Sequence, residues 1–448
     1  MTVARELAGY LLGAAYEDLP PETIENAKKI IVSTLASAAA GSTIRSAQIA
    51  REVVQEQGGT QEATAWFSDG LRLPLPSAVR VNAMLSDAAA SDDSDIRNIA
   101  HTGTILTAMS LAAAEKTGAS GRDVLAAIVT GYEASGRIGE ALWPGLGERG
   151  IHACVITVFG GVIAGARLLG LTEEQAAEAL SLAATSMGGL TVSTNTWARE
   201  YHAGASALAA SNAVLSARKG YFANPDTFES ERGFFEVFGA TKEAAAKVTQ
   251  GFGDEWDIAT HLTIKIWPGS TPLSAAVEAA CNAAIEGNVD PAEVASIRVA
   301  GPRFKTLIGH RHPKDLPGAI HSVAYFLSSA VVDREFTWGH VSMDKVLDPT
   351  IDRLQDLVDV EPDTDPSRHT WGWGATVTIT LKDGRRFSST VNEPRGSGPR
   401  GIEWADVEHK VRTLTPQSEK SPAEVEKILE LGHGFDELAS VTPLIELL

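Results

Sequence analysis

Three carboxylates and a histidine are concentrated in one short segment of the chain. The stretch SDDSDIRNIAHTG (91–103) contains Asp92, Asp93 and Asp95, and His101 follows six residues after the last of them. Carboxylates this close repel one another, so the cluster costs stability unless something nearby needs it. The segment could therefore be a metal loop, an acid/base site or a solvated turn.

The spacing argues against the metal loop. A calcium loop that began at Asp93 would need oxygen ligands at alternating positions, glycine at the sixth position and glutamate at the twelfth. The chain has Arg97 at the fifth position, Asn98 at the sixth and Thr104 at the twelfth. A zinc site would need several His or Cys at short, paired spacing, and only His101 lies close by. The sequence therefore predicts no metal site.

Further titratable residues stand in short junctions elsewhere in the chain. They are His101 in NIAHTG, His152 in RGIHAC, Arg199 and His202 in WAREYHAG, Lys265 in IKIWPG and Tyr325 in HSVAYF. A histidine near a helix start meets the positive end of the helix dipole, which lowers its pKa and favours a neutral imidazole. Each residue alone is more typical of a hydrogen-bonded or surface position. General acid/base chemistry requires several of them to converge on one cleft.

Composition and charge exclude several classes of partner. The 448-residue chain has a formal net charge of −19, which argues against nucleic acid and against an anionic membrane surface. The longest uncharged run, 179–198, is rich in Ser, Thr, Asn and Gly and lacks the apolarity of a membrane span. Cys154 and Cys281 form no CxxC pattern and fit buried thiols in a reducing compartment. MTVARELAGYLLG lacks a signal-peptide pattern, so we expect a soluble, cytoplasmic protein.

Nucleotide-binding motifs do not occur in the context that they require. FGGVIAG (159–165) and GATKEAAAK (239–247) do not join a strand to a helix, and their glycines fit close packing or capping better. A GxSxG nucleophile elbow is also absent. We therefore expect neither a nucleotide cofactor nor serine hydrolase chemistry.

The elements that position these residues are mainly helices. Helical patterns are expected near 76–90, 104–117, 121–142, 152–169 and 203–219, and Thr172 with Gln175 forms a capping-box signature. After residue 272 the pattern changes to short alternating strands, and ATVTITLKDGRRFSSTV (375–391) predicts a hairpin that turns at Asp383-Gly384. Helical patterns return after residue 402. The sequence predicts a mostly α protein, with a helical domain (1–265, completed by 402–448) and an inserted, smaller α+β domain (266–401).

Six segments follow one another in a specific order. They are NAMLSDAAASDDSDIRNIAH (82–101), GIHACV (150–155), REYHAGASALAASNAVLSARKGY (199–221), ESERGFFEVFG (229–239), KIWPG (265–269) and VTITLKDGRRF (377–387). In order and spacing the chain resembles the MmgE/PrpD family of 2-methylcitrate dehydratase-, cis-aconitate decarboxylase- and iminodisuccinate epimerase-like enzymes. The resemblance covers nearly the whole length.

The resemblance implies a helical domain, an α+β lid, a homodimer and cofactor-free chemistry on a small carboxylate metabolite. The shared step is abstraction of a proton beside a carboxylate or carbonyl. Loss of hydroxide, loss of carbon dioxide or reprotonation on the other face then decides the product. Cations suit this chemistry because they hold carboxylates and stabilise the developing charge, while histidine moves the proton.

The resemblance carries over His101, His152, Arg199, His202 and Lys265 as site residues, and Tyr325 is added from the titratable residues above. Expected catalytic residues are His101, His152 and Tyr325, expected substrate-binding residues are Ser94, Arg199, His202 and Lys265, and expected supporting residues are Asp92 and Asp93. Six positions depart from the family pattern, and at two of them Ser91 replaces a phenylalanine and Arg199 replaces a lysine. Asp87 replaces a histidine, Ala90 replaces an aspartate, Ser270 replaces a frequent cysteine and Ser274 replaces a frequent histidine.

The leading hypothesis is a cofactor-independent lyase, a hydratase or dehydratase that acts on a small carboxylic acid. An epimerase, an isomerase or a decarboxylase would use the same proton abstraction. The D-D-S core (92–94) and its seven-residue offset to His101 resemble the epimerase pattern more than the D-D-T pattern of the dehydratases. The losses at Ala90 and Ser274 motivate a third hypothesis, a catalytically silent relative that binds a metabolite.

Overall fold

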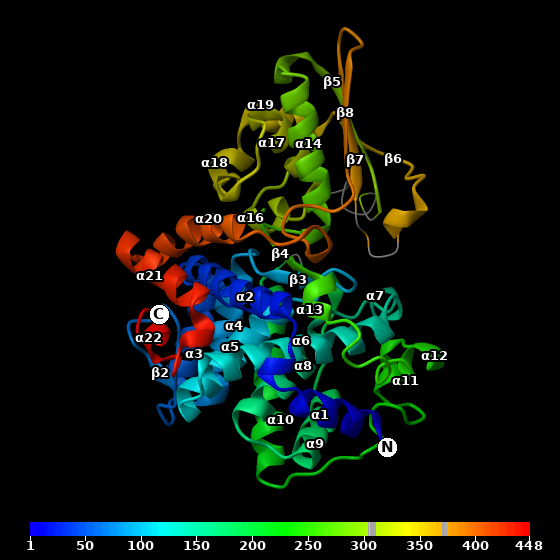
Figure 1. Ribbon diagram of the computed structural model, residues 1–448. Helices are drawn as coiled ribbons and strands as arrows, with labels where there is room; N and C mark the ends of the chain where they lie inside the picture. Colours follow the sequence, from blue (N-terminus) through cyan, green and yellow to red (C-terminus); the bar gives the residue numbers. More distant parts are fainter. Residues whose placement is uncertain (195, 303, 305–310, 370–371, 373) are drawn as a thin grey trace. The chain divides into compact units, whose positions relative to one another are not determined.

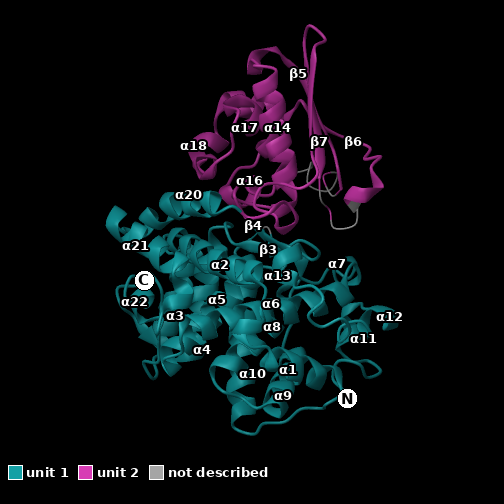
Figure 2. Ribbon diagram, in the orientation of Figure 1, with its two compact units in different colours: residues 1–264, 403–448 teal, residues 265–402 magenta. Residues whose placement is uncertain are grey.

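Most of the described chain is helical, and a small mixed sheet lies in its C-terminal part (Figure 1). The computed structural model describes residues 1–194, 196–302, 304, 311–369, 372 and 374–448. The chain divides into unit 1 (1–264 and 403–448) and unit 2 (265–402), which Figure 2 colours separately. The predicted fold class, a mostly α protein with an α+β domain, is confirmed. Within the described ranges, no helix has the length and apolarity needed to cross a membrane.

Unit 1 is built from long helices with shorter ones between them. The long helices are α1 (Val3–Gly13), α2 (Pro21–Gly41), α3 (Arg45–Gln57), α4 (Leu75–Ala88), α5 (Thr102–Thr117), α6 (Gly121–Leu142), α8 (Cys154–Leu168), α9 (Glu173–Ala184), α10 (Ala198–Arg218), α20 (Trp404–Leu414) and α21 (Pro422–His433). The shorter ones are α7 (Gly145–Glu148), α11 (Phe234–Phe238), α12 (Lys242–Ala245), α13 (Asp257–Thr260) and α22 (Thr442–Ile445). Two antiparallel strand pairs complete the unit, β1 (Ala63–Thr64) with β2 (Arg72–Leu73) and β3 (Asp93–Asp95) with β4 (Leu262–Ile264).

The centre of unit 1 is formed by α5 and α8, whose side chains are buried on nearly every side. A helix that is apolar all round has to be enclosed by other elements, and α8 packs against α5, α6, α9 and α10. Glycines allow a close approach of two of these helices. A Cβ atom on Gly160 of α8 would lie 2.8 Å from the carbonyl oxygen of Gly131 in α6. The glycines of FGGVIAG therefore serve helix packing, as expected.

The helices predicted near 76–90, 104–117, 121–142 and 152–169 are confirmed as α4, α5, α6 and α8, but α10 begins earlier than predicted. It starts at Ala198 instead of near residue 203, because the polar sequence around Arg199 gives the helical period too few apolar residues to show. Arg199 and His202 consequently lie inside the first turns of the helix and not ahead of it. Their i, i+3 spacing places both side chains on one helix face.

The C-terminal segment of unit 1 contacts the acidic segment directly. Helix α20 packs on α2, and the Lys410 side chain of α20 is fully buried. Its ammonium donates to Ser33 Oγ at 2.8 Å and to the backbone carbonyl of Ser91. A buried lysine needs such partners because an unpaired charge in the interior is costly. Lys410 therefore fixes the start of the 91–103 segment.

Unit 2 combines a four-stranded sheet with helices. Its elements are α14 (Ser274–Glu286), β5 (Val294–Ala300), α16 (Leu316–Ala319), α17 (Val323–Asp333), α18 (Met343–Val346), α19 (Pro349–Gln355), β6 (Val358–Glu361), β7 (Ala375–Leu381) and β8 (Arg386–Val391). The strand order is β6-β5-β7-β8, with β5 and β6 parallel and the other pairs antiparallel. The predicted hairpin is confirmed, since β7 and β8 join at Asp383-Gly384. Alternate residues of β7 are buried, and α14 packs against β7 and β8.

Candidate active site

The 91–103 segment of unit 1 is a buried loop and not a solvated turn. Asp92, Asp93 and Ser94 are almost completely inaccessible to solvent, and β3 pairs with β4. Two residues near the ends of the segment have left-handed backbone conformations, Ala90 with φ of 51° and Ile99 with φ of 57°. This conformation costs about 1–2 kcal/mol for a residue with a Cβ atom, and such strain clusters at functional sites.

Asp92 and Asp93 hold His101 and the start of α5 in place. Asp93 Oδ2 accepts the backbone N–H of Gly103 at 3.0 Å in the first turn of α5. His101 Nδ1 lies 2.6 Å from Asp92 Oδ2 and 2.7 Å from the backbone carbonyl of Asp93, and Ser94 Oγ lies 3.3 Å from the same nitrogen. A carbonyl oxygen can only accept, so Nδ1 carries a proton. A neutral His101 ring therefore has its lone pair on Nε2.

His152 and His202 form a second pair of imidazoles. His152 precedes α8 and His202 lies in α10, and their ring centroids are 4.5 Å apart. His152 Nδ1 accepts the backbone N–H of Cys154 at 3.2 Å. Because an N–H group can only donate, this nitrogen bears the lone pair and Nε2 of the neutral ring carries the proton. His101 and His152 thus present opposite tautomers.

Burial keeps these two imidazoles neutral. It lowers the pKa of His152 to about 3, with smaller contributions from the charges of His202, His101 and Arg199. Burial also lowers the pKa of His202. The pKa of His152 is lowered, as expected. The largest cause is burial of the ring, which disfavours its charged form, and not the helix dipole.

The Arg199 side chain contacts residues at the C-terminal end of α4. Its guanidinium donates to the backbone carbonyls of Asp87 and, at 3.4 Å, of Ala88. Nε lies 3.5 Å from Asp87 Oδ2. Asp87 is buried, and both of its carboxylate oxygens are without a hydrogen-bond partner. We call Asp87, His101, His152, Arg199 and His202 the imidazole cluster.

A second buried group of charges lies in the same unit. We call Asp95, Arg97, Glu133, Arg137 and Asp257 the paired cluster. The Arg97 guanidinium is fully buried and contacts the carboxylates of both Asp95 and Asp257. Glu133 accepts from Arg137 Nε at 2.6 Å and from the backbone N–H of Asp257 at 2.8 Å. Each carboxylate of this cluster contacts a guanidinium group, so this cluster serves the structure.

The structure brings together most of the site residues that the sequence predicts. Asp92, Asp93, Ser94, His101, His152, Arg199 and His202 all lie in unit 1. Lys265 and Tyr325 belong to unit 2, where Lys265 is buried and Tyr325 OH donates to the backbone carbonyl of His340 at 2.6 Å. Burial raises the pKa of Tyr325 to about 12. Roles for these two residues stay predictions.

Sequence reasoning missed two members of the site. It treated Cys154 only as a buried thiol and Asp87 only as a departure from a pattern. The His-x-Cys spacing was the available signal, because it places both side chains at the start of one helix. Two groups now have donor atoms within 4.8 Å of one another, His152 with Cys154 and His202, and Asp87 with Asp92 and His101. Either group has the donor types of a metal site.

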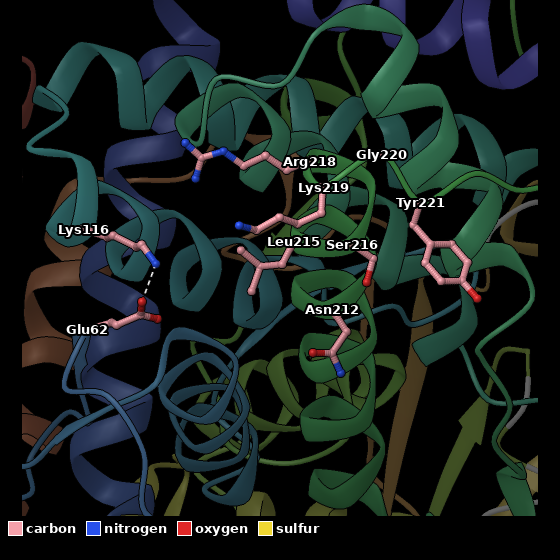
Figure 3. Close-up of a pocket in the computed structure, with 9 residues that line it drawn as sticks. All are labelled: Glu62, Lys116, Asn212, Leu215, Ser216, Arg218, Lys219, Gly220 and Tyr221. Atoms are coloured by element: carbon pink, nitrogen blue, oxygen red, sulfur yellow. Dashed lines mark hydrogen bonds and ion pairs between the residues drawn. The ribbon is translucent and has the colours of Figure 1, made fainter.

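A surface pocket of about 980 Å³ lies at the other end of α10 (Figure 3). Its lining residues are Glu62, Lys116, Asn212, Leu215, Ser216, Arg218, Lys219, Gly220 and Tyr221. Lys116 Nζ donates to Glu62 Oε1 at 2.5 Å, and Figure 3 marks this contact with a dashed line. Arg199 and Arg218 are about 28 Å apart along a helix that rises 1.5 Å per residue. This pocket is therefore separate from the imidazole cluster.

Comparisons with known proteins cover the whole chain. The model for the MmgE/PrpD N-terminal domain matches residues 5–247, and that for the MmgE/PrpD C-terminal domain matches residues 267–432. A cis-aconitate decarboxylase from Aspergillus terreus is 27% identical over 483 residues, covering 100% of this chain and 96% of the relative. A cis-aconitate decarboxylase from Homo sapiens is 22% identical, covering 100% of this chain and 94% of that protein.

Proposed function

We propose that this chain, which belongs to the MmgE/PrpD family, is a lyase that adds water to, or removes it from, a small carboxylic acid. The observation that carries the proposal is the pair of opposite tautomers at His101 and His152. One ring can accept a proton through Nε2 and the other can donate one through Nε2. Dehydration needs such a pair, because one proton leaves carbon and another must reach the departing hydroxyl.

In this mechanism His101 is the base and His152 is the acid. His101 Nε2 takes the proton from the carbon beside the carboxylate, and Asp92 stabilises the imidazolium that results, because it already lies against Nδ1. The proton on His152 Nε2 passes to the hydroxyl, which leaves as water, and the proton that His101 removed from carbon then neutralises the imidazolate left on His152. Arg199 is a buried, permanent cation that stabilises the developing negative charge. The steps need no cofactor.

Decarboxylation is the second candidate, and the relatives favour it. Full-length relatives from two organisms are cis-aconitate decarboxylases. In that reaction the bond between carbon and the carboxylate breaks, carbon dioxide leaves with its electrons left on carbon, and a histidine protonates that carbon. The same imidazoles and Arg199 would serve, so the substrate decides between the two reactions.

The test incubates the full-length protein in heavy water with a panel of small di- and tricarboxylic acids and analyses the products by mass spectrometry. Loss or gain of water supports the proposal, and loss of carbon dioxide supports decarboxylation. Deuterium uptake with no change in formula would identify an epimerase or isomerase. Absence of turnover and exchange across the panel would contradict all of these and favour a metabolite-binding relative.

Single substitutions then test the assignment of base and acid. His101→Gln and His152→Gln should each lower turnover by about 10²–10⁴-fold, the usual contribution of a general acid or base. His409→Gln is the matched control, because His409 is exposed on α20, and it should leave turnover unchanged. Circular dichroism confirms that each variant is folded. Turnover preserved in both site variants would show that the assignment is wrong.

A further inference from the structure

Three side chains from different parts of unit 1 lie close to Gly189. A Cβ atom on Gly189 would lie 2.8 Å from Cys154 Sγ, 3.3 Å from His152 Cβ and 3.4 Å from His202 Cδ2. His152 and Gly189 are also joined through their backbones, with a hydrogen bond of 3.1 Å from the His152 N–H to the Gly189 carbonyl. A methyl group at this position would clash with the thiol, so the glycine is what allows Cys154, His152 and His202 to lie this close together.

Two of these three side chains have polar atoms with weak hydrogen bonds or none. His202 Nδ1 is buried and has no hydrogen-bond partner. Cys154 Sγ has only long sulfur contacts to backbone carbonyls, at 3.5 Å to Gly188 and 3.8 Å to His152. Buried polar atoms without partners cost free energy unless a ligand satisfies them. The carboxylate of Asp87 also lacks hydrogen bonds and acts electrostatically on both Cys154 and His202.

We propose that His152, Cys154 and His202 form a binding site for a divalent transition-metal ion of the zinc class. One thiolate and two imidazoles are the donor set that such borderline-soft ions prefer. Their donor atoms lie within 4.8 Å of one another, whereas tetrahedral bonds to zinc would place them about 3.5 Å apart. The side chains would therefore have to close by at most about 1 Å when the ion binds.

Binding of the ion changes the protonation of its ligands. The Cys154 thiol loses its proton to solvent as the sulfur–metal bond forms, and each imidazole binds through one nitrogen and keeps its ring proton on the other. The long contact between the Cys154 N–H and His152 Nδ1 is given up if the ion binds Nε2. The thiolate and Asp87 together supply two negative charges near the ion. Arg199, which contacts Asp87, opposes the ion and limits its affinity.

The second group of donors is a weaker candidate for the same ion. It consists of Asp87, Asp92 and His101, and it contains no sulfur. His101 Nδ1 already donates to the backbone carbonyl of Asp93 and lies 2.6 Å from Asp92 Oδ2. Softer ions choose sulfur and imidazole over carboxylates, so the site around Gly189 is the one that we assign.

Occupancy of this site has a consequence that rests on the proposed function. An ion bound to His152 Nε2 would take the place of the proton that this nitrogen donates to the substrate. Bound metal should therefore inhibit turnover, and chelation should restore it. The metal site itself does not depend on the reaction, because binding can be measured without substrate.

The experiment titrates the EDTA-treated full-length protein with Co²⁺, which replaces zinc and reports its ligands by absorption. We expect visible bands of a tetrahedral site and a near-ultraviolet band from thiolate-to-cobalt charge transfer, both displaced by Zn²⁺. Cys154→Ser should abolish the thiolate band. His202→Asn, and Gly189→Ala, which would place a methyl group 2.8 Å from Cys154 Sγ, should each weaken Co²⁺ binding by about tenfold or more. Cys281→Ser is the matched control and should keep the full spectrum, because Cys281 lies in unit 2.

The outcomes separate the metal site from the proposed reaction. Absence of the thiolate band in the unmodified protein, or a band that survives Cys154→Ser, would overturn the metal site. A Cys154-dependent band with loss of turnover that EDTA reverses supports both inferences. A Cys154-dependent band with unchanged turnover supports the metal site and contradicts the assignment of His152 as the acid.

Discussion

The paired cluster and the imidazole cluster are two buried groups of charges in unit 1, and one segment contributes to both. Within 91–103, Asp95 and Arg97 belong to the paired cluster, whereas His101 belongs to the imidazole cluster. In the paired cluster, Arg97 is shared by two carboxylates. In the imidazole cluster, the Asp87 oxygens and His202 Nδ1 have no hydrogen-bond partner.

This difference shows how to separate structural charges from functional ones. A buried charge that is removed from a complete pair leaves its partners uncompensated, and the fold loses several kcal/mol. Substitution of a buried group that has no hydrogen-bond partner should cost the fold little stability. Its unused donor or acceptor atoms are what a substrate or an ion can bind. Substitutions in the two clusters should therefore have opposite patterns of effect on stability and on activity.

The largest effect is expected from Arg97→Met. The substitution leaves Asp95 and Asp257 facing each other in the interior without their cation, so the free energy of unfolding should fall by about 3–5 kcal/mol. Urea denaturation followed by circular dichroism measures this change. Arg412→Met is the control, because Arg412 pairs with Glu408 and Glu426 on the exposed side of α20. It should cost no more than about 1 kcal/mol. Similar costs in the two variants would contradict the role of the paired cluster.

A smaller loss is expected from Gly136→Ala, which adds a methyl group against the paired cluster. The new Cβ would lie 2.1 Å from Asp257 Oδ2 and 2.2 Å from its Cγ, so the carboxylate must leave its position beside Arg97. Overpacking of this kind costs about 1–3 kcal/mol. Thermal unfolding compares the variant with Gly147→Ala, whose Cβ would meet nothing within 4 Å. An unchanged melting temperature in Gly136→Ala would show that the cluster can rearrange freely.

The two clusters also show what the sequence could and could not predict. The acidic segment, His101, His152 and the i, i+3 pair Arg199 and His202 were all visible as residue types at particular spacings. The sequence did not show that segment 91–103 contributes to two different clusters. Arg97 pairs with Asp257, 160 residues away, and only the fold brings such partners together. The fold class followed from periodicity, whereas the start of α10 did not, because its first turn is polar.

A pH-dependent effect of intermediate size is expected at His152. Its pKa is lowered to about 3 by burial and by the nearby His202, His101 and Arg199, whereas an unfolded histidine titrates near 6.5. Below pH 6.5 the unfolded chain therefore binds a proton that the folded ring does not, and stability falls as the pH falls towards 3. At pH 5 this amounts to about 2 kcal/mol.

His152→Asn should remove that part of the acid sensitivity. Urea denaturation of both proteins at pH 7 and pH 5, in EDTA, gives the two slopes, and the variant should lose less stability between these pH values than the unmodified protein. His409→Asn is the control, because an exposed histidine should leave the slope unchanged. Equal slopes in His152→Asn and the unmodified protein would mean that the ring is protonated in the folded state.

The smallest effect on stability is expected from Asp87→Asn. The carboxylate oxygens of Asp87 accept no hydrogen bond, so the substitution loses only the 3.5 Å ion pair with Arg199 and relieves a buried charge. These two terms oppose each other, and we expect the free energy of unfolding to change by no more than about 1 kcal/mol. Asp257→Asn is the matched substitution in the paired cluster and should cost about 3 kcal/mol or more, because it breaks the contact with Arg97. Urea denaturation of the two variants measures the difference. Equal losses would mean that Asp87 is as structural as Asp257, and the distinction between the clusters would fail at the residue where it is sharpest.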